Sequence, residues 1–323
     1  MLEHGGNLVP VATQYGIALN DWLDLSTGIN PQGYTVPEIP PEIWQRLPAD
    51  DDGLTEAACR YYGCQFALPV AGSQAALQVL PTLRAPCRVA MLSPMYNEHV
   101  HAWQQHGHHV QTYANFTALQ TAQADVVLLC NPNNPTAQFF STQVLLDLHA
   151  SLARRGGWLI VDEAFMDATP EHSIAAHAHL EGLFVLRSLG KFFGLAGARV
   201  GFLLAQESIL QAVQEKLGPW TLAGASRYVA KQSLEDTAWQ ISTRIRLQTD
   251  GARLAALLTR YDLTPQAGTA LFQYVPTLHA VEIHYALARQ GIWVRLFRQI
   301  PALRFGLPSN NDWGKLDQAL QHL

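Results

Sequence analysis

The residues whose types and spacing point most directly to chemistry lie in one short stretch of the chain. Ser188 and Lys191 follow an apolar run over 183–186, and Arg199 comes eight residues after the lysine. A run of this kind predicts a strand, which would place the three side chains beyond its carboxyl end. A lysine amine can form a Schiff base with an aldehyde, and a serine and an arginine can bind a phosphate dianion. The stretch therefore predicts a site for an aldehyde that carries a phosphate.

Alone, Ser-x-x-Lys is a short motif that also occurs by chance, so this interpretation depends on the rest of the sequence. Three upstream segments place polar groups just past apolar runs. The run 126–130 precedes Asn134, the run 158–161 precedes Asp162, and Gly72-Ser73-Gln74 follows Val70 and opens a helical segment. In an open parallel sheet, ligands bind outside the carboxyl ends of the strands. These groups are therefore expected to meet in one crevice.

Pyridoxal phosphate is the phosphate-bearing aldehyde that fits this set of residues. Asp162, buried against the pyridine nitrogen, would keep that nitrogen protonated and make the ring an electron sink. Asn134 can donate a hydrogen bond to the phenolate oxygen of the ring, and Tyr96 can stack on the ring face. Each residue also has an ordinary structural explanation, as a helix cap, a turn or a packing contact. The cofactor is predicted because all of them occur in this order.

The cofactor phosphate needs its own binding groups, and the same segments supply them. The backbone N–H groups of Gly72, Ser73 and Gln74 lie at a predicted helix start, where they favour an anion. Ser188 and Arg199 add a hydroxyl and a guanidinium to the same site. Lys191 and Asp162 are then the predicted catalytic residues.

The composition of the chain is typical of a soluble globular enzyme. It has 323 residues, of which 48% are hydrophobic and 15% charged, so it is long enough for two domains. A net charge of −5 argues against a nucleic-acid partner. No apolar run reaches membrane-spanning length, and the amino terminus lacks a signal peptide's features. The four cysteines have no metal-binding or redox spacing. We therefore expect a cytoplasmic protein that binds neither nucleic acid nor membrane.

The order of apolar runs and helical stretches predicts an α/β fold with two domains and an arm. Residues 1–45 are rich in proline, glycine and turn residues and are predicted to form the arm. Residues 46–220 alternate strand-like and helical segments, which is typical of a large domain with a mostly parallel sheet. Residues 221–323 are predicted to form a smaller α+β domain. The clearest predicted strands cover 89–92, 126–130, 158–161, 183–186, 200–204, 270–275, 292–295 and 302–306, with the last three antiparallel, and a long helical region covers about 206–260.

A cluster of histidines at 99, 101, 106, 108 and 109 raises the possibility of a metal site. His99 and His101 are two residues apart, so on a helix they point to different faces. No cysteine or carboxylate pattern completes a metal shell around them. We therefore predict no functional metal, and expect the cluster to form a polar helix face and the edge of the following strand.

Several motifs give nearly the whole chain a resemblance to a known enzyme family. They are His4-Gly-Gly-Asn7, Asp24-Leu-Ser-Thr-Gly-Ile-Asn30-Pro31, Asp162-Glu-Ala-Phe165, Arg187-Ser-Leu-Gly-Lys191-Phe and Pro219-Trp220-Thr221. The chain resembles the aspartate-aminotransferase superfamily of pyridoxal phosphate enzymes, in its histidinol-phosphate aminotransferase branch, and most closely the threonine-phosphate decarboxylases of cobalamin biosynthesis. The resemblance implies the PLP-dependent transferase fold type I and a homodimer. It also implies an amino-terminal arm that joins the carboxyl-terminal third in the small domain.

The resemblance also implies which residues bind the substrate. Arg304 matches the superfamily arginine that clamps an α-carboxylate. Arg295 matches a family residue that helps to bind the substrate's phosphate, although a surface arginine on a strand is the simpler alternative. His4 and Asn7 can add donors to that phosphate, and Asn30 is a further expected substrate contact.

The implied reaction is the decarboxylation of a small phosphorylated amino acid, L-threonine O-3-phosphate, to (R)-1-aminopropan-2-yl phosphate. Lys191 is expected to return the proton to the α-carbon, because the amine is released beside it. Two alternatives stay open. One is an aminotransferase with a phosphate-bearing substrate such as histidinol phosphate. The other is a slow, cofactor-binding subunit that works with a corrinoid-pathway protein.

Three positions depart from the pattern of the family. Phe165 replaces a tyrosine of the histidinol-phosphate branch, which removes one hydrogen bond to the phenolate, although the similar decarboxylases share the phenylalanine. Leu47-Pro48-Ala49 stands where the family has Tyr-Pro-Asp, whose tyrosine reaches across the dimer to the cofactor phosphate. Gly28 replaces an asparagine near Asn30. Each change predicts the loss of one possible contact.

Overall fold

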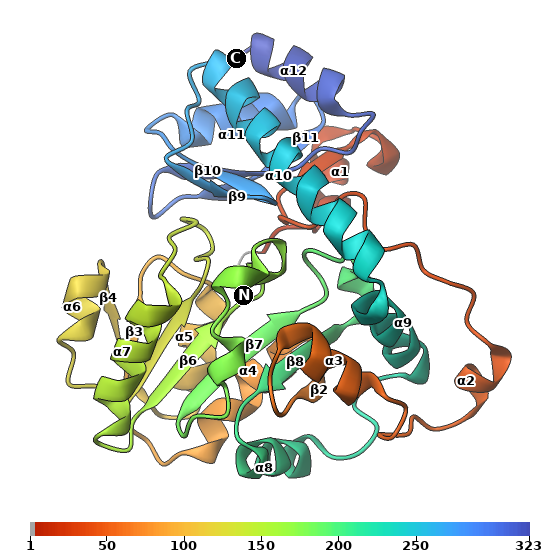
Figure 1. Cartoon of the computed structure of the whole chain (residues 1–323). Helices are drawn as coiled ribbons and strands as arrows, with labels where there is room; N and C mark the ends of the chain where they lie inside the picture. The colour runs from red at the N-terminus through yellow and green to blue at the C-terminus, as the bar shows by residue number, and fades with distance from the viewer. Residues whose placement is uncertain (1–3) are drawn as a thin grey trace. The chain divides into compact units, whose positions relative to one another are not determined.

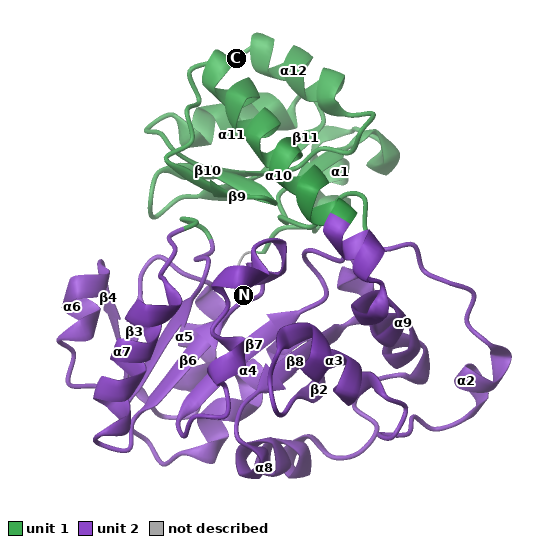
Figure 2. Ribbon diagram, viewed as in Figure 1, with its two compact units in different colours: residues 1–33, 135–137, 242–323 green, residues 34–134, 138–241 purple. Residues whose placement is uncertain are grey.

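The computed structural model describes residues 4–323 and divides into two compact units. Figure 2 colours the two units. The first unit contains the chain up to residue 33 together with 135–137 and 242–323, and the second contains 34–134 and 138–241. Across residues 4–323, the helices are all too short or too polar to cross a membrane.

The second unit is built on a seven-stranded sheet in the order β2-β8-β7-β6-β5-β3-β4 (Figure 1). Its strands are β2 Leu68–Ala71, β3 Arg88–Leu92, β4 His109–Tyr113, β5 Val126–Cys130, β6 Trp158–Asp162, β7 Leu183–Ser188 and β8 Val200–Leu204. Strands β4, β3, β5, β6 and β7 are mutually parallel, whereas β8 is antiparallel to both β7 and β2. The predicted mostly parallel α/β sheet is confirmed.

The central strands form because their sequences are apolar on both sides. Every residue of β5 and β8 is buried, as are all but the first residue of β6 and the last of β7. A parallel sheet covered on both faces requires such continuous apolar runs. One core cluster joins these strands to α4, α5 and α8 through Ala76, Trp103 and Val213.

Helices connect and cover the strands of this unit (Figure 1). They are α2 Pro41–Gln45, α3 Leu54–Tyr62, α4 Ser73–Val79, α5 Asn97–Gln105, α6 Phe116–Gln120, α7 Thr142–Ala153, α8 Glu207–Leu217 and α9 Gly224–Glu235. Short 3-10 helices lie at Leu80–Leu83, Met166–Ala168, Pro170–His172, Ala175–His177 and Ala196–Ala198. Helix α4 contacts β2, β7 and β8, and helix α7 contacts β6.

The first unit has a five-stranded sheet in the order β1-β11-β12-β10-β9. Its strands are β1 Leu23–Leu25, β9 Ala267–Thr269, β10 Phe272–Pro276, β11 Ile292–Phe297 and β12 Ala302–Gly306. Its helices are α1 Leu8–Tyr15, the greater part of α10 Thr237–Arg260, α11 Ala280–Ala288 and α12 Trp313–Gln321, with a 3-10 helix at Leu19–Asp21. The three predicted antiparallel strands are present, and β1 from the amino-terminal segment adds a parallel strand beside β11.

The unit boundaries differ from those predicted at 45 and 220. Residues 34–45 belong with the large sheet because the Tyr34 N–H donates to the Phe193 carbonyl at 2.8 Å and the Tyr34 ring packs on Trp239 at 5.3 Å. Residues 221–241 join the same unit because Arg227 pairs with Asp52. The predicted helical region at 206–260 is three helices, and the last of them crosses the boundary. Composition gave no sign of these contacts, since they join residues far apart in the chain.

Candidate active site

The site is built at the carboxyl ends of three neighbouring parallel strands. Strand β6 ends at Asp162, strand β7 ends at Ser188, and Asn134 follows strand β5. Lys191 lies three residues beyond β7 and is half-buried, with its ammonium nitrogen 5.5 Å from the centre of the Phe165 ring. The order β7-β6-β5 brings these predicted groups to one edge of the sheet, where ligands bind in such folds.

Asp162 is held by a histidine that the sequence analysis did not place in the site. The His99 Nε2 lies 2.8 Å from Asp162 Oδ2, and both side chains are more than 90% buried. The other carboxylate oxygen accepts from the Ala164 N–H at 3.0 Å. A carboxylate oriented in this way and shielded from water is suited to hold a proton on a basic nitrogen.

The prediction of a polar histidine face is therefore wrong for His99. Its side chain turns inward because it shares the buried face of α5 with Ala102 and Trp103, three and four residues further on. The prediction also fails for His108, which is buried and contacts the Cys87 N–H and the Pro81 carbonyl. The remaining three histidines of the cluster, at 101, 106 and 109, are exposed as predicted.

One group of possible metal ligands occurs among residues 4–323. Ligand atoms of His99, Cys130 and Asp162 lie within 4.8 Å of one another. A metal bound here would have to replace the proton shared by His99 and Asp162. Burial, reinforced by Asp162, raises the pKa of the Cys130 thiol well above its usual value, which disfavours the thiolate that metals prefer. The geometry therefore favours the hydrogen-bonded pair over a metal centre.

Two glycines permit close packing near the start of α4, where the sequence predicts a cradle for an anion. Gly72 has φ +70°, and a Cβ there would lie 2.7 Å from the Arg199 guanidinium. A Cβ at Gly201 would lie 2.3 Å from the Ser73 nitrogen. Only glycine allows this close approach of β8, Arg199 and the helix start. Arg199 itself has φ +54°, an uncommon conformation for a non-glycine residue and one that clusters at functional sites.

Polar side chains complete the cradle. The Ser188 hydroxyl oxygen accepts from the Gly190 N–H at 3.2 Å, which orients it at the end of β7. The Tyr96 hydroxyl donates to Gln74 at 3.4 Å, and the Gln74 amide donates to Glu98 at 3.1 Å. Burial, with Glu98 and Asp162, raises the pKa of Tyr96 to about 12, so its hydroxyl stays protonated at neutral pH. The predicted cofactor residues thus include cationic and hydrogen-bonding groups.

The loop after β5 is fixed by its other asparagines. The Asn131 side chain accepts from the Phe140 N–H at 2.9 Å and donates to the Phe140 carbonyl at 3.0 Å. The Asn133 amide donates to the Pro94 carbonyl at 2.9 Å. These bonds fix the backbone on which Asn134 stands, so Asn131 and Asn133 are positioning residues that the sequence analysis did not identify.

A buried ion-pair cluster links the ends of β6 and β7. Arg187 donates to Glu163 at 2.5 Å and also contacts Asp167, while the centre of the Tyr62 ring lies 4.6 Å from its guanidinium. Burial raises the pKa of Glu163, and Arg187 opposes that shift. Glu163 follows Asp162, and Arg187 precedes Ser188. The ion pair between Glu163 and Arg187 therefore holds the end of β6 to the end of β7, where the predicted site residues lie.

The predicted substrate-binding residues all lie in the other unit. Arg295 and Arg304 are paired across strands β11 and β12. Arg304 is 5% exposed and donates to the Ser26 carbonyl at 2.6 Å. Burial and the neighbouring Arg295 lower the pKa of Arg304 to about 9, an effect that Asp24 partly opposes. A buried, crowded arginine of this kind is suited to bind an anion, which would stabilise the charged form.

The remaining predicted substrate residues differ in exposure. His4 and Asn7 are exposed, and Asn7 precedes helix α1 without a side-chain capping bond. Asn30 is 3% exposed, and its carboxamide oxygen accepts from the Gln32 N–H at 3.0 Å and lies 3.4 Å from an Arg246 nitrogen. A substrate contact by Asn30 stays a prediction, because its carboxamide oxygen already contacts Gln32 and Arg246 within the protein.

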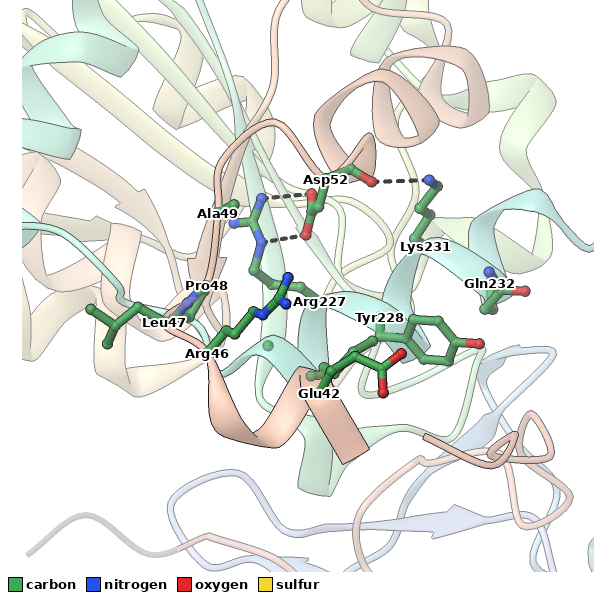
Figure 3. A pocket seen from close by; sticks show the side chains of 12 residues that line it. Glu42, Arg46, Leu47, Pro48, Ala49, Asp52, Arg227, Tyr228, Lys231 and Gln232 are labelled. Carbon is green, nitrogen blue, oxygen red and sulfur yellow. Dashed lines mark hydrogen bonds and ion pairs between the residues drawn. The ribbon is translucent and has the colours of Figure 1, made fainter. Parts of the chain in front are cut away.

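A separate cavity of about 350 Å³ lies on the second unit between α2 and α9 (Figure 3). Arg227 donates to both oxygens of Asp52, at 2.7 and 2.8 Å, and Lys231 donates to the Asp52 carbonyl at 2.9 Å. Figure 3 shows this bonded group beside Leu47 and Pro48, which belong to the segment that departs from the family pattern. No residue of the predicted site lines this cavity.

A family model described as aminotransferase class I and II matches residues 41–323 of the chain. The chain belongs to this family. A relative in Pseudomonas aeruginosa, named threonine-phosphate decarboxylase, is 52% identical over 99% of this chain and 97% of its own. A relative of the same name in Sinorhizobium sp. is 39% identical over 95% of this chain and 93% of its own.

Solved structures of the class I and II aminotransferase family share the fold. Histidinol-phosphate aminotransferase from Sinorhizobium meliloti in complex with pyridoxal 5'-phosphate superposes with a TM-score of 0.82 at 18% identity, covering 97% of this chain and 93% of that one. The predicted PLP-dependent transferase fold type I is thereby confirmed.

Proposed function

We propose that the protein is a pyridoxal phosphate-dependent decarboxylase that converts L-threonine O-3-phosphate to (R)-1-aminopropan-2-yl phosphate and carbon dioxide, in cobalamin biosynthesis. The single observation that carries the proposal is the 52% identity, over nearly the whole of both chains, to a relative named threonine-phosphate decarboxylase. The matched region covers 99% of this chain and therefore includes both units.

The residues of the second unit fit the cofactor. Gly72 and Gly201 allow Arg199 and β8 to pack closely on the start of α4, and the Arg199 guanidinium and the Ser188 hydroxyl are groups that suit a phosphate dianion. Asp162, held by His99, would keep a proton on the pyridine nitrogen, and Asn134 would donate to the phenolate oxygen. When bound, pyridoxal phosphate supplies an electron sink for the bond that breaks at the substrate α-carbon.

The chain's own groups then decide which bond breaks. Arg304 would bind the α-carboxylate, and Arg295, with His4 and Asn7, would bind the substrate phosphate. Holding both anions fixes the rotation about the α-carbon, so that the carbon–carboxylate bond is the one aligned for cleavage. Lys191 would deliver a proton to the α-carbon after carbon dioxide leaves.

A homodimer is the proposed assembly. Trp44 of α2 is 65% exposed, and Leu47, which lines the cavity between α2 and α9, is 67% exposed. A partner that covered this segment would remove both apolar side chains from water. Most soluble oligomers are symmetric dimers, so a second copy of the chain is the expected occupant. A corrinoid-pathway protein as an additional partner stays a prediction.

The test is a comparison of two substrates on purified protein supplied with pyridoxal phosphate. L-threonine O-3-phosphate should give carbon dioxide and aminopropanol phosphate. Histidinol phosphate with 2-oxoglutarate is the control, because a histidinol-phosphate aminotransferase from Shewanella oneidensis is 32% identical over 60% of this chain. Glutamate formed from the control mixture, without carbon dioxide from phosphothreonine, would replace the decarboxylase by an aminotransferase.

A further inference from the structure

Ser26 occupies a central position in the unit that carries the predicted substrate residues. It follows strand β1 and is fully buried. Both its N–H and its hydroxyl donate to the same Asp24 carboxylate oxygen, at 2.8 and 2.6 Å. These two hydrogen bonds to Asp24 fix both the backbone and the side chain of Ser26. The Ser26 carbonyl oxygen and the lone pairs of its hydroxyl oxygen therefore point in defined directions.

The Ser26 hydroxyl holds the amino-terminal segment. Its oxygen accepts from the Gly6 N–H at 2.9 Å. Gly5 packs against the same residue so closely that a Cβ at Gly5 would lie 2.5 Å from the Ser26 carbonyl oxygen and 2.8 Å from its hydroxyl. Gly5 is therefore needed for contact with Ser26, and Gly6 suits its φ of +85°, which gives that motif a physical reason.

The Ser26 carbonyl holds the buried arginine. It accepts from Arg304 at 2.6 Å, on the strand where Arg304 faces Arg295. Asp24, which fixes Ser26, also favours the charged form of Arg304. One residue thus bonds the amino-terminal segment through its side chain and the arginine through its backbone.

We propose that Ser26 is a positioning residue for substrate specificity, which holds the His4–Asn7 segment and Arg304 in a fixed relation so that they distinguish a phosphorylated amino acid from its unphosphorylated form. This inference rests on the proposed function. If Arg304 binds the carboxylate and the segment contributes to binding the phosphate, the distance between the two anions is set through Ser26. Pre-fixing that distance reduces the entropy lost on binding and favours only a ligand that carries both groups.

Two variants break the connection from opposite sides. Ser26→Ala removes the acceptor for Gly6 and the donor to Asp24 but keeps the carbonyl that Arg304 needs. Gly5→Ala keeps Ser26 and pushes the segment away from it. Gly5 lies outside the helices and strands, so this variant keeps the test valid should Ser26→Ala fold poorly.

The measurement is the dissociation constant of L-threonine O-3-phosphate and of L-threonine by calorimetry on protein whose bound cofactor has been reduced with borohydride to stop turnover, together with KM and kcat for the phosphorylated substrate on the active enzyme. Both variants should weaken phosphothreonine binding by about three- to tenfold, the size expected when the hydrogen bond that ties the segment to Ser26 is lost. KM should rise by the same factor and kcat should fall, because the phosphate no longer fixes the rotation about the α-carbon, while L-threonine binding and cofactor affinity stay within twofold of wild type. A general structural effect would weaken L-threonine binding and cofactor affinity as well.

Matched controls are Ser233→Ala and Gly314→Ala. Ser233 is equally buried and donates to a backbone carbonyl, and a Cβ at Gly314 would meet nothing within 4 Å. Neither should change the ratio of the two dissociation constants. An unchanged ratio in both Ser26→Ala and Gly5→Ala, with wild type active on phosphothreonine, would overturn this inference alone. A wild-type protein that neither binds nor decarboxylates phosphothreonine would overturn the proposed function and this inference with it.

Discussion

Arg295 and Arg304 stand directly opposite each other on the antiparallel strands β11 and β12. Like charges in this arrangement repel, and the repulsion is greater here because Arg304 is almost fully buried. Burial and Arg295 together lower the pKa of Arg304 to about 9. An anion bound to the pair would offset the repulsion, so the arrangement is most stable with an anionic ligand.

The first prediction follows from the lowered pKa of Arg304. The guanidinium is charged below this pKa and neutral above it, and an anion binds the charged form. Affinity for L-threonine O-3-phosphate should therefore be retained below pH 9 and fall about tenfold for each pH unit above it. Calorimetric titrations from pH 7.5 to 10 would measure this.

The Arg304→Ala protein is the control for that profile, because the substrate amine titrates in the same range. Because the substrate amine titrates in the same way with both proteins, the ratio of wild-type to variant affinity depends on Arg304 alone. A ratio that stays constant across pH 9 would show that Arg304 does not bind the anion in its charged form. The variant should also keep its bound cofactor, since Arg304 lies outside the cofactor residues.

The second prediction concerns Lys191. Replacing it with alanine should abolish both turnover and the visible absorption of the bound cofactor, because the amine is the group that can bond to the aldehyde. Absorbance spectra of the purified variant with added pyridoxal phosphate would measure this. Lys216→Ala, on the exposed side of α8, should match wild type. Full activity in Lys191→Ala would refute the assignment of the site.

The third prediction concerns His99 as the residue that orients Asp162. His99→Ala should weaken cofactor binding on the order of tenfold, since it removes a hydrogen bond to a buried carboxylate. Fluorescence titration of the cofactor-free protein with pyridoxal phosphate gives the dissociation constant. His101→Ala is the matched control, because His101 lies on the exposed side of the same helix. Equal affinities in the two variants would remove His99 from this role.

His99 also shows where sequence patterns stop being informative. The strands that carry Asn134, Asp162 and Lys191 were predictable because a buried parallel strand is a continuous apolar run, and each functional group follows one. Histidine is a polar residue, so its type predicts an exposed position for His99. Only its spacing to Ala102 and Trp103 indicates that it lies on the buried side of a helix. Its partner Asp162 is 63 residues away, so the bond between them depends on how helix and sheet pack.

The unit boundaries were unpredictable for a similar reason. Arg227 and Asp52 form a pair across 175 residues, and that pair places residues 221–241 with the large sheet. Composition along the chain records local propensity, whereas a boundary depends on contacts between distant segments. The motif His4-Gly-Gly-Asn7 could be recognised from the sequence. The close packing of Gly5 on Ser26 depends on the three-dimensional structure and could not be predicted from it.

The fourth prediction tests the buried ion-pair cluster. Arg187→Ala should lower the free energy of unfolding by about 3–5 kcal/mol, because it leaves Glu163 and Asp167 buried without their cation. Glu163→Gln should be milder, since Asp167 still pairs with Arg187. Urea unfolding followed by circular dichroism would measure both.

Arg60→Ala is the control for Arg187, because Arg60 pairs with Glu235 at 2.8 Å on the surface, with 65% of its side chain exposed. Such a pair contributes about 0–1 kcal/mol. If the two arginine variants lost equal stability, burial would not be what makes the Arg187 cluster important.

The fifth prediction concerns the proposed homodimer. Trp44 and Leu47 are exposed apolar side chains three residues apart, and Leu47 lines the cavity between α2 and α9. A partner on this segment would remove both side chains from water. The double variant Trp44→Asp, Leu47→Asp would place two buried charges in the interface and should convert the dimer to a monomer in light scattering coupled to gel filtration. Leu278→Asp is the control, since Leu278 is 86% exposed in the other unit and far from this surface in the sequence. A wild-type monomer, or a double variant that remains dimeric, would show that the interface lies elsewhere or does not form.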